Sequence, residues 1–370
     1  MNILIVRLGA LGDIVHTIPA AAALRAAMPG ARIDWIVDAK HRDIVDLVTV
    51  VDGVLPLEAR TLGAWTAAVR RLRLGRYDAA LDFQGLMKSA VLARASGARR
   101  VAGFSIWHLR EKTARPFYSE TGSARDAGEH VISKNLSLLR VVGVETDRAE
   151  FPLARTDAAA VGAVRRTVGP GRFALMNPGA AWANKRWPAS RFADVAVFLR
   201  EVRGVRSVVL WGPGEQALAR EIAGASGGAA VEAPPTRVPD ILALAREASL
   251  MLSGDTGPLH VAAAAGTPIV AIMGPTSPRR NGPWAPEDLT VSRFEQCGCH
   301  YDRRCHETRW CLEDVSVAEV TAAIQQRLGT RSDADPGGSG PQGTRIGADS
   351  RGSDPQETRI AADDSGATES

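Results

Sequence analysis

The residues best suited to binding an anion form the segment Gly-Asp-Thr-Gly-Pro-Leu-His at residues 254–260. An apolar run before it predicts a strand, and the small residues after it predict a helix. Pro258 suits the first turn of a helix, so the segment directs unpaired N–H groups and a positive helix dipole at a ligand. A diphosphate suits such a site. The alternative is an ordinary turn that Asp255 or Thr256 caps.

Four other loops also follow runs that predict strands. They read LGALGD, DFQG, NPGAAWANK and WGPGE. Because ligands of parallel sheets collect at the carboxyl ends of the strands, we expect the five loops to line one cleft. The strands are expected at residues 2–6, 32–37, 77–83, 173–176, 207–210, 248–252 and 267–273, and helices at 14–28, 86–95, 191–202, 215–223 and 261–265.

Length and pattern predict an α/β protein of two domains. The chain has 370 residues, of which 45% are hydrophobic, and no apolar run approaches the roughly 20 residues that span a bilayer. We expect domains at 1–160 and 161–330. The first strand contains Arg7 and no cleavage pattern follows it, so it is not expected to be a secretory signal, and a cytoplasmic location is expected.

Residues 331–370 predict a disordered polar tail. They contain no aromatic residue, and the sequence SGPQGTRIGADS is followed by the similar SDPQETRIAADD. The tail holds 4 Arg against 8 acidic residues, so the rest of the chain carries 41 basic and 33 acidic residues, a net charge of +8 against +4 overall.

The positive charge is concentrated between residues 60 and 115. Twelve Lys or Arg stand there against three acidic residues. An anionic partner is therefore expected. A nucleic acid is not, because no nucleic-acid motif and no pattern of interleaved aromatic residues accompanies the charge.

The loops together resemble the glycosyltransferase family of the lipopolysaccharide heptosyltransferases, and within it heptosyltransferase I most closely. The resemblance covers most of residues 1–325. It rests on LGALGDIVHTIPA, DFQGLMKSA, NPGAAWANKRWP, WGPGE and SGDTGPLHVAAAAGTP followed by MGPT. It implies the GT-B fold, in which two Rossmann-like domains with parallel sheets face each other; the first binds the acceptor and the second the nucleotide sugar. It also implies that a last helix at 317–328 crosses back onto the first domain.

The resemblance assigns the chemistry to a few residues. Asp13 matches the family's general base for an inverting sugar transfer; a helix N-cap is its alternative role. Lys185 matches the cation that stabilises the leaving diphosphate, although the neighbouring Arg186 could replace it. Donor contacts are expected at Glu215, Asp255, Thr256, Gly257 and His260. No metal or other cofactor is required.

The resemblance also implies the two substrates. The donor is ADP-heptose, and the acceptor is a Kdo sugar of a lipid A precursor. Arg60, Lys88 and Arg110 are candidates for binding the acidic groups of the acceptor. The basic surface around them is expected to hold the enzyme peripherally on the anionic inner face of the inner membrane.

Four cysteines at 297, 299, 305 and 311 depart from the heptosyltransferase I pattern. Four thiols within fifteen residues allow a structural zinc site, but their spacing lacks C-x2-C pairs, so free thiols or a redox-labile loop are favoured.

Three alternative functions remain. The chain could be a heptosyltransferase II or III that acts on a heptose acceptor. It could be a nucleotide-dependent oxidoreductase, with LGALGD as the phosphate loop and Asp38 as the ribose ligand, although the G-x-G-x-x-G spacing is missing. It could also be a non-catalytic nucleotide-sugar-binding protein, which would not need Asp13.

Overall fold

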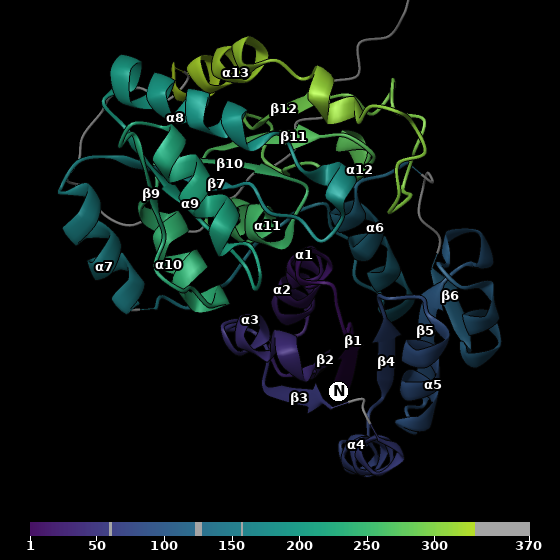
Figure 1. The fold of residues 1–370 in the computed structure, drawn as a ribbon. Coiled ribbons are helices and arrows are strands. Elements are labelled where there is room, and N and C mark those ends of the chain that lie inside the picture. The colour runs from purple at the N-terminus through teal and green to yellow at the C-terminus, as the bar shows by residue number, and fades with distance from the viewer. Residues whose placement is uncertain (59–60, 123–127, 157, 330–370) are drawn as a thin grey trace, which may run out of the picture.

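Two lobes, each built on a six-stranded parallel sheet, make up the computed structural model, which describes residues 1–58, 61–122, 128–156 and 158–329 (Figure 1). The N-terminal sheet has the order β3-β2-β1-β4-β5-β6. Its strands are β1 (Asn2–Val6), β2 (Arg32–Asp38), β3 (Gly53–Leu57), β4 (Ala79–Asp82), β5 (Arg100–Phe104) and β6 (Glu120–Gly122). The order reverses between β1 and β4, which is where doubly wound sheets bind their ligands.

The C-terminal sheet repeats this topology with the order β12-β11-β10-β7-β8-β9. Its strands are β7 (Phe173–Asn177), β8 (Arg206–Val209), β9 (Ala230–Glu232), β10 (Leu250–Gly254), β11 (Ile269–Met273) and β12 (Leu289–Ser292). The order reverses between β7 and β10. The prediction of an α/β protein with two parallel sheets is confirmed.

Helices cover both faces of each sheet. The N-terminal lobe has α1 (Leu11–Val15), α2 (Ile18–Ala27), α3 (Arg42–Asp46), α4 (Leu62–Leu74), α5 (Met87–Ala95) and α6 (Val131–Leu138). The C-terminal lobe has α7 (Ala159–Val168), α8 (Ala189–Arg203), α9 (Gln216–Ala225), α10 (Val238–Glu247), α11 (Gly257–Ala264), α12 (Pro278–Asn281) and α13 (Val317–Gly329). The predicted domain boundary at residue 160 falls in the first turn of α7.

Alternate residues of a strand pack in different layers. On β1, Ile3 and Ile5 join the cluster that contains residues of α2 and α6, whereas Leu4 and Val6 join the cluster that contains residues of α4 and α5. Both faces are buried, which explains why β1 is apolar at every position. The same reason holds for β7, β10 and β11, each of which is buried throughout.

The first predicted helix is broken. The sequence pattern predicts one helix over 14–28, but α1 ends at Val15 and α2 begins at Ile18. Pro19 occupies the first turn of α2, where its missing N–H costs no hydrogen bond, so a new helix begins there. Helix α1 packs against α11 of the second lobe (Figure 1).

The expectation that the last helix packs on the first domain is wrong. The buried residues of α13 are Val320, Ile324 and Leu328, and they belong to the C-terminal cluster together with residues of α8. Arg327 forms an ion pair of 2.9 Å with Asp288, the residue before β12. The single apolar stripe of α13 is therefore already used by its own lobe.

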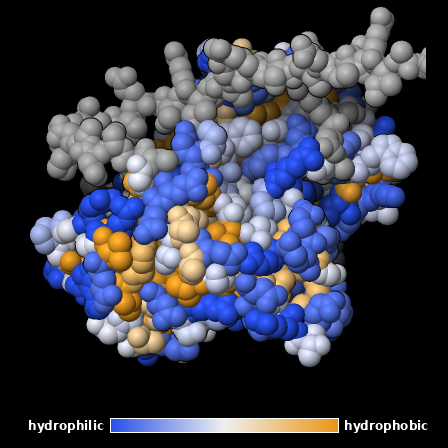
Figure 2. Space-filling view, turned by 90° about the horizontal axis from the view of Figure 1, so that it is seen from above, coloured by the Kyte–Doolittle hydropathy of each residue, from blue (hydrophilic) through white to orange (hydrophobic). Residues whose placement is uncertain are grey.

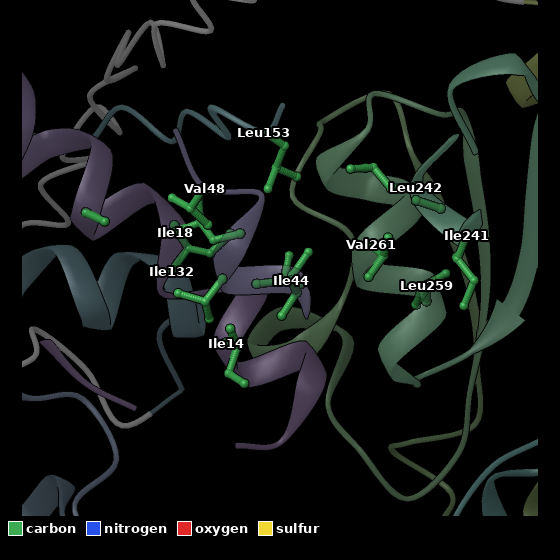
Figure 3. Packing of buried hydrophobic residues seen from close by; sticks show 14 of the residues in the cluster. Ile14, Ile18, Ile44, Val48, Ile132, Leu153, Ile241, Leu242, Leu259 and Val261 are labelled. Atoms are coloured by element: carbon green, nitrogen blue, oxygen red, sulfur yellow. The ribbon is translucent and has the colours of Figure 1, made fainter. Parts of the chain in front are cut away.

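One continuous hydrophobic cluster joins the two lobes. Figure 3 shows Ile14 and Ile44 from the N-terminal lobe opposite Leu242, Leu259 and Val261 from α10 and α11. All five side chains are fully buried. Burial on this scale orients the lobes in the way that a protein core does.

The face that Figure 2 shows is mostly hydrophilic, with groups of hydrophobic residues among the hydrophilic ones. Within the described ranges, no helix has the length and apolar character needed to cross a bilayer.

We predict that Gly12→Ala destabilises the protein by about 1–3 kcal/mol. A Cβ at Gly12 would lie 2.4 Å from Cδ2 of His260, so α1 and α11 would have to separate. Denaturant unfolding measures the effect. Gly30→Ala is the control, because nothing lies within 4 Å of a Cβ there. Equal stability of the Gly12→Ala variant and the parent would show that this contact is not required.

Candidate active site

The loops at the two sheet reversals meet between the lobes. Helix α1 follows β1, and α11 follows β10, and the two helices pack together with Gly12 against the ring of His260. The loop that carries Asp13 therefore faces the segment 254–260 across the lobe boundary, as the sequence predicts. Only a residue without a side chain allows this approach at position 12.

Asp13 is the third residue of α1, and Ala10 is the N-cap. Its Oδ2 accepts a hydrogen bond from Ala10 N at 3.3 Å and forms an ion pair of 2.8 Å with Arg7. Its side chain is 30% exposed, and within the described part of the chain Oδ1 has no hydrogen-bond partner. Asp13 is thus not the N-cap residue itself, but its Oδ2 caps the helix from the third position by accepting the Ala10 N–H. The other carboxylate oxygen is left to accept a proton from a ligand.

Arg7 fixes the position of this carboxylate. It lies on the chain directly after β1, and its side chain is buried, with Nη1 donating to the Phe83 carbonyl and Nη2 contacting Asp13. A buried guanidinium paired with a carboxylate holds that carboxylate in one place. The sequence gives no sign of this pairing, because Arg7 stands at the end of an apolar run, six positions before Asp13.

Lys134 on α6 is a second cation that sequence reasoning missed. Its Nζ donates to the His108 carbonyl at 2.7 Å and lies 4.4 Å from the centre of the Phe104 ring. Burial, and then the positive charge of Arg280 and Arg7, lower the pKa of Lys134 to about 8. A lone lysine inside an amphipathic helix gives no sequence signal of this kind, because only the fold brings the other cations to it.

Lys185 lies at the segment 254–260. Its Nζ is 2.6 Å from Oδ2 of Asp255, and both side chains are nearly buried. Gly254 allows this approach, because a Cβ there would lie 2.9 Å from the Lys185 carbonyl oxygen. Arg186 points elsewhere: it donates to the Ala180 carbonyl. The structure thus distinguishes the two cations, and Lys185 is the one beside α11.

The N-terminus of α11 has no side-chain cap. Thr256 is the N-cap residue, but its hydroxyl bonds to Nδ2 of Asn177 at 3.1 Å and to Oγ of Ser253 at 3.0 Å. The capping turn considered as the alternative is therefore not formed by this side chain. First-turn N–H groups and the helix dipole are left for an anion, and Lys185 adds a positive charge beside them.

A chain of hydrogen bonds crosses from one lobe to the other. Nε2 of His260 lies 3.0 Å from Oδ1 of Asp255, and its Nδ1 lies 3.1 Å from Nε2 of His16, the residue after α1. Burial opposes ionisation of Asp255, but the hydrogen bond from His260 and the charge of Lys185 outweigh it and lower its pKa. Asp255 is thus a carboxylate that holds both cation and imidazole in place.

His16 is buried and uncharged. Burial, and then the neighbouring His260 and His130, lower its pKa well below 6.5. Its Nδ1 is buried and has no partner within the described residues. The sequence does not identify His16 as a site residue, because it falls inside the predicted helix 14–28, where a histidine is most often a packed residue.

His130 makes a second connection between the lobes. It is the N-cap of α6, with Nδ1 accepting from Ile132 N at 3.1 Å, and its Nε2 donates to the Gly282 carbonyl at 3.0 Å. Burial lowers the pKa of His130 to about 4. Its ring also packs edge-on against Trp284.

Glu215 lies at the start of α9 and accepts a hydrogen bond from Gly212 N at 3.1 Å. It is the N-cap residue and not a first-turn acid. Arg186 Nη2 lies 3.7 Å from its Oε1. Glu215 and Lys185 thus come from different loops at the carboxyl edge of the C-terminal sheet.

The structure describes two of the three residues that are candidates for binding the acceptor. Lys88 on α5 and Arg110 are exposed, and Arg60 lies outside the described residues. The neighbouring Asp82 is fully buried, and it accepts hydrogen bonds from Ser89 and from Tyr118 at 2.8 and 2.7 Å. Asp82 therefore shapes the DFQG turn that precedes α5 and is not itself available to a ligand.

The four cysteines are free thiols in this structure. Sγ of Cys299 lies 3.2 Å from Sγ of Cys305, and Cys311 hydrogen-bonds to Cys297. Burial, and then the bond to Cys297, raise the pKa of Cys311 to about 12. Over the described ranges no group of three or more His, Cys, Asp or Glu residues is arranged to hold a metal ion.

A cavity of about 1400 Å³ lies at the other end of α11. Its walls include Phe151, Ala265 and Trp284, and it contains none of the predicted site residues. The carboxyl end of a helix carries partial negative charge, so a diphosphate is not expected there.

His16 and His130, the buried histidines between the lobes, predict that the free energy of unfolding depends on pH. As the pH falls from 6.5 towards 4, the unfolded chain binds protons that folded His130 and His16 do not, so stability decreases. For His130 the loss between about pH 7 and about pH 5 is on the order of 2 kcal/mol, measured by denaturant unfolding. His130→Asn is expected to flatten the profile. An unaltered slope in His130→Asn would contradict the assignment.

Known proteins are similar to this chain in sequence and in fold. The family model "Glycosyltransferase family 9 (heptosyltransferase)" matches residues 65–311. Lipopolysaccharide heptosyltransferase 1 of Pseudomonas aeruginosa is 28% identical over 320 residues, which cover 82% of this chain and 87% of that protein. The protein of the same name from Escherichia coli K12 is 27% identical, with 75% and 89% covered.

Solved structures show the same architecture. E. coli heptosyltransferase WaaC with ADP superposes with a TM-score of 0.72 at 22% identity, covering 88% of this chain and all of that one. E. coli ADP-heptose lps heptosyltransferase II also gives 0.72, at 20% identity, covering 89% and 99%. The GT-B fold is confirmed. The family model and the sequence relatives support an enzyme of the glycosyltransferase type. The chain belongs to glycosyltransferase family 9, the heptosyltransferase family.

Proposed function

We propose that this enzyme transfers heptose with inversion from ADP-heptose to a Kdo residue of the lipopolysaccharide inner core, on a lipid A precursor. The observation that carries the proposal is the position of Asp13. Its free Oδ1 lies on one lobe, one residue from Gly12, which packs against His260 of the other lobe. A base on one lobe and an anion-binding helix N-terminus on the other are the two groups that such a transfer needs.

The donor binds to the C-terminal lobe in this mechanism. The diphosphate of ADP-heptose lies at the N-terminus of α11, where N–H groups of the segment 254–260 and Nζ of Lys185 face it. Glu215 accepts hydrogen bonds from hydroxyl groups of the donor. As the glycosidic bond breaks, negative charge grows on the leaving ADP, and the helix dipole and Lys185 offset it.

The acceptor binds to the N-terminal lobe. Its hydroxyl oxygen attacks the anomeric carbon from the face opposite the leaving ADP, and its proton passes to Oδ1 of Asp13. Arg7 keeps that carboxylate in place through the other oxygen. The carboxylates and phosphates of the acceptor pair with Arg60, Lys88 and Arg110, and the enzyme works on the cytoplasmic face of the inner membrane.

The names of the relatives support the donor and the reaction. Several are called lipopolysaccharide heptosyltransferase 1, and one E. coli relative, 25% identical over 336 residues, is called lipopolysaccharide heptosyltransferase 3. Transfer to a heptose acceptor is therefore the second candidate. A screen of ADP-heptose and ADP-mannose against Kdo-bearing and heptose-bearing lipid A separates the two. Turnover with neither acceptor would reject both.

We predict that Asp13→Asn lowers kcat by about 10²- to 10⁴-fold and leaves ADP affinity within about twofold, because the base acts on the acceptor alone. Transfer is measured by ADP release, and ADP affinity by calorimetry. Asp46→Asn is the matched control, since Asp46 also pairs with an arginine of the N-terminal lobe. Turnover equal to the parent in Asp13→Asn would reject Asp13 as the base.

Lys185→Ala is expected to weaken ADP-heptose binding and to slow transfer, by about 10²-fold in kcat/KM. It removes the cation beside α11 and leaves Asp255 paired with His260 alone. Arg186→Ala, the neighbouring cation that points away, is expected to have a smaller effect. Thermal unfolding of each variant distinguishes lost catalysis from lost folding. A larger effect of Arg186→Ala on a folded enzyme would transfer the role to Arg186.

A further inference from the structure

The four cysteines form two pairs, and the two members of each pair differ in exposure. Cys299 and Cys305 make one pair, with their sulfurs 3.2 Å apart, and Cys297 and Cys311, joined by a hydrogen bond, make the other. Cys297 and Cys299 are buried, whereas Cys305 and Cys311 are half-buried. A reagent in solution therefore reaches one sulfur of each pair, and the second sulfur lies in contact with the first.

Backbone N–H groups hold the sulfurs of the first pair in place. Sγ of Cys299 accepts a hydrogen bond from His306 N at 3.3 Å, and Sγ of Cys305 accepts one from Glu307 N. Cys299 N in turn donates to Sγ of Cys297 at 3.4 Å, which connects the two pairs. The fold thus holds the two thiols of the first pair side by side before any covalent bond joins them.

The cysteine loop, residues 297–311, is bonded to the turn that carries Lys185. Asn184, the residue before Lys185, is buried, and its Nδ2 donates to the Asp302 carbonyl at 3.0 Å. Asp302 stands between the two cysteines of the first pair, and its backbone N donates to the Cys299 carbonyl at 3.0 Å. The position of Asn184, and with it that of Lys185, therefore depends on the conformation of the chain between these two cysteines.

Trp182 makes a second connection between the loop and this turn. Nζ of Lys185 lies 4.4 Å from the centre of the Trp182 ring, and the guanidinium carbon of Arg303 lies 5.8 Å from it. Contacts between a cation and an aromatic ring are attractive within about 6 Å. Lys185 is thus held by Asp255 on one side and by a ring that the cysteine loop contacts on the other.

We propose that the pair Cys299–Cys305 is a modification site that a peroxide closes to a disulfide, and that this bond weakens the contact of Lys185 with the donor diphosphate. The inference deepens the proposed function and rests on it, because the diphosphate is the ligand assigned to Lys185 there. Oxidation of this pair makes donor binding depend on the redox state of the loop.

The reaction takes two steps. The Cys305 thiolate attacks one oxygen of the peroxide, the O–O bond breaks, and the sulfur becomes a sulfenic acid while hydroxide leaves. Sγ of Cys299 then attacks the Cys305 sulfur and expels water, which forms the S–S bond. Two thiols lose two electrons and two protons in total, and one hydrogen peroxide becomes two water molecules.

The new bond changes the chain between the two cysteines. A covalent bond brings two sulfurs closer together than the thiol contact of the reduced protein. The chain from Cys299 to Cys305 must rearrange, and the Asp302 carbonyl shifts relative to Nδ2 of Asn184. Lys185 follows Asn184 directly, so its Nζ is displaced from the N-terminus of α11. Because a hydrogen bond to a charged group contributes about tenfold or more to affinity, its loss weakens donor binding.

The rate of oxidation is expected to rise with pH. Burial, and then the hydrogen bond with Cys299, raise the pKa of Cys305 above that of an ordinary thiol. The thiolate is the form that attacks a peroxide, so the disulfide should form faster at about pH 9 than at about pH 7. The loop therefore responds slowly at neutral pH.

The test compares the ADP affinity of the full chain before and after oxidation. The reduced protein is exposed to hydrogen peroxide at about pH 8, the peroxide is removed, and ADP binding is measured by calorimetry. We expect the oxidised protein to bind ADP at least about tenfold more weakly, and dithiothreitol to restore the affinity. Mass spectrometry of peptides, after alkylation of the remaining thiols, should find Cys299 joined to Cys305. Absence of this bond, or unchanged ADP affinity in a protein that carries it, would overturn the proposal.

Cys305→Ser and Cys311→Ser are matched variants. Cys305→Ser should bind ADP as the reduced parent does and keep that affinity under peroxide, whereas Cys311→Ser leaves the first pair intact and should respond as the parent does. Both retain all six methionines, so methionine oxidation does not distinguish them. Cys299→Ser removes the same bond from its buried side and should behave as Cys305→Ser does. A response lost only in Cys311→Ser would contradict the assignment to the first pair.

Asn184→Ala tests the route from the cysteines to Lys185. The variant lacks the hydrogen bond to the Asp302 carbonyl, so in its reduced form it should already bind ADP more weakly than the parent. Oxidation should then weaken binding further by less than about twofold, although the disulfide still forms. A full tenfold response in Asn184→Ala would show that the effect does not pass through this contact.

Two further outcomes separate this inference from the proposed function and from a metal site. An enzyme whose ADP affinity depends on the disulfide, but which transfers heptose to neither acceptor, would refute the proposed reaction and leave the redox site intact. Stoichiometric zinc or iron in the purified reduced chain, measured by elemental analysis, would overturn the redox site, because the thiols would then be metal ligands.

Discussion

The close contact of α1 with α11 is the constraint on which the site depends. Gly12 has no side chain, so the ring of His260 reaches the N-terminal lobe and hydrogen-bonds to His16. Behind this polar contact, Ile14 and Leu259 belong to one hydrophobic cluster shared by both lobes. Apolar burial supplies the force between the lobes, and the histidines specify their orientation, because hydrogen bonds between buried groups tolerate little displacement.

Asp255 and Asp13, the two aspartates near this contact, differ in how many of their carboxylate oxygens are engaged by other side chains. Asp255 is nearly buried, and Lys185 and His260 occupy both of its carboxylate oxygens. Asp13 is partly exposed, and Arg7 and Ala10 engage only Oδ2. The first is thereby committed to holding other side chains in place. The second keeps one oxygen available, which is what a general base needs. The residue type alone does not distinguish them.

The sequence predicted the main strands and most of the loops that build the site. Polar loops after apolar runs identify the carboxyl edges of parallel sheets, since parallel strands are buried on both faces and loops carry the remaining polarity. The prediction for the last helix failed, because an apolar stripe at residues 317–328 shows that a helix is buried but not against which lobe. Strands β3, β5, β6, β9 and β12 were not predicted, and all but β5 are edge strands or short.

The sequence by itself determined the class of fold, the family and the identity of the loops that meet between the lobes, because these follow from local hydrophobic pattern and from motifs of neighbouring residues. Only the tertiary structure decided which side chains act together. Arg7 with Asp13, Lys185 with Asp255, and His16 with His260 are pairs separated by 6, 70 and 244 positions. Ion pairs and hydrogen bonds act over a few ångströms in space, and the separation of two residues along the sequence does not indicate whether the fold brings them that close.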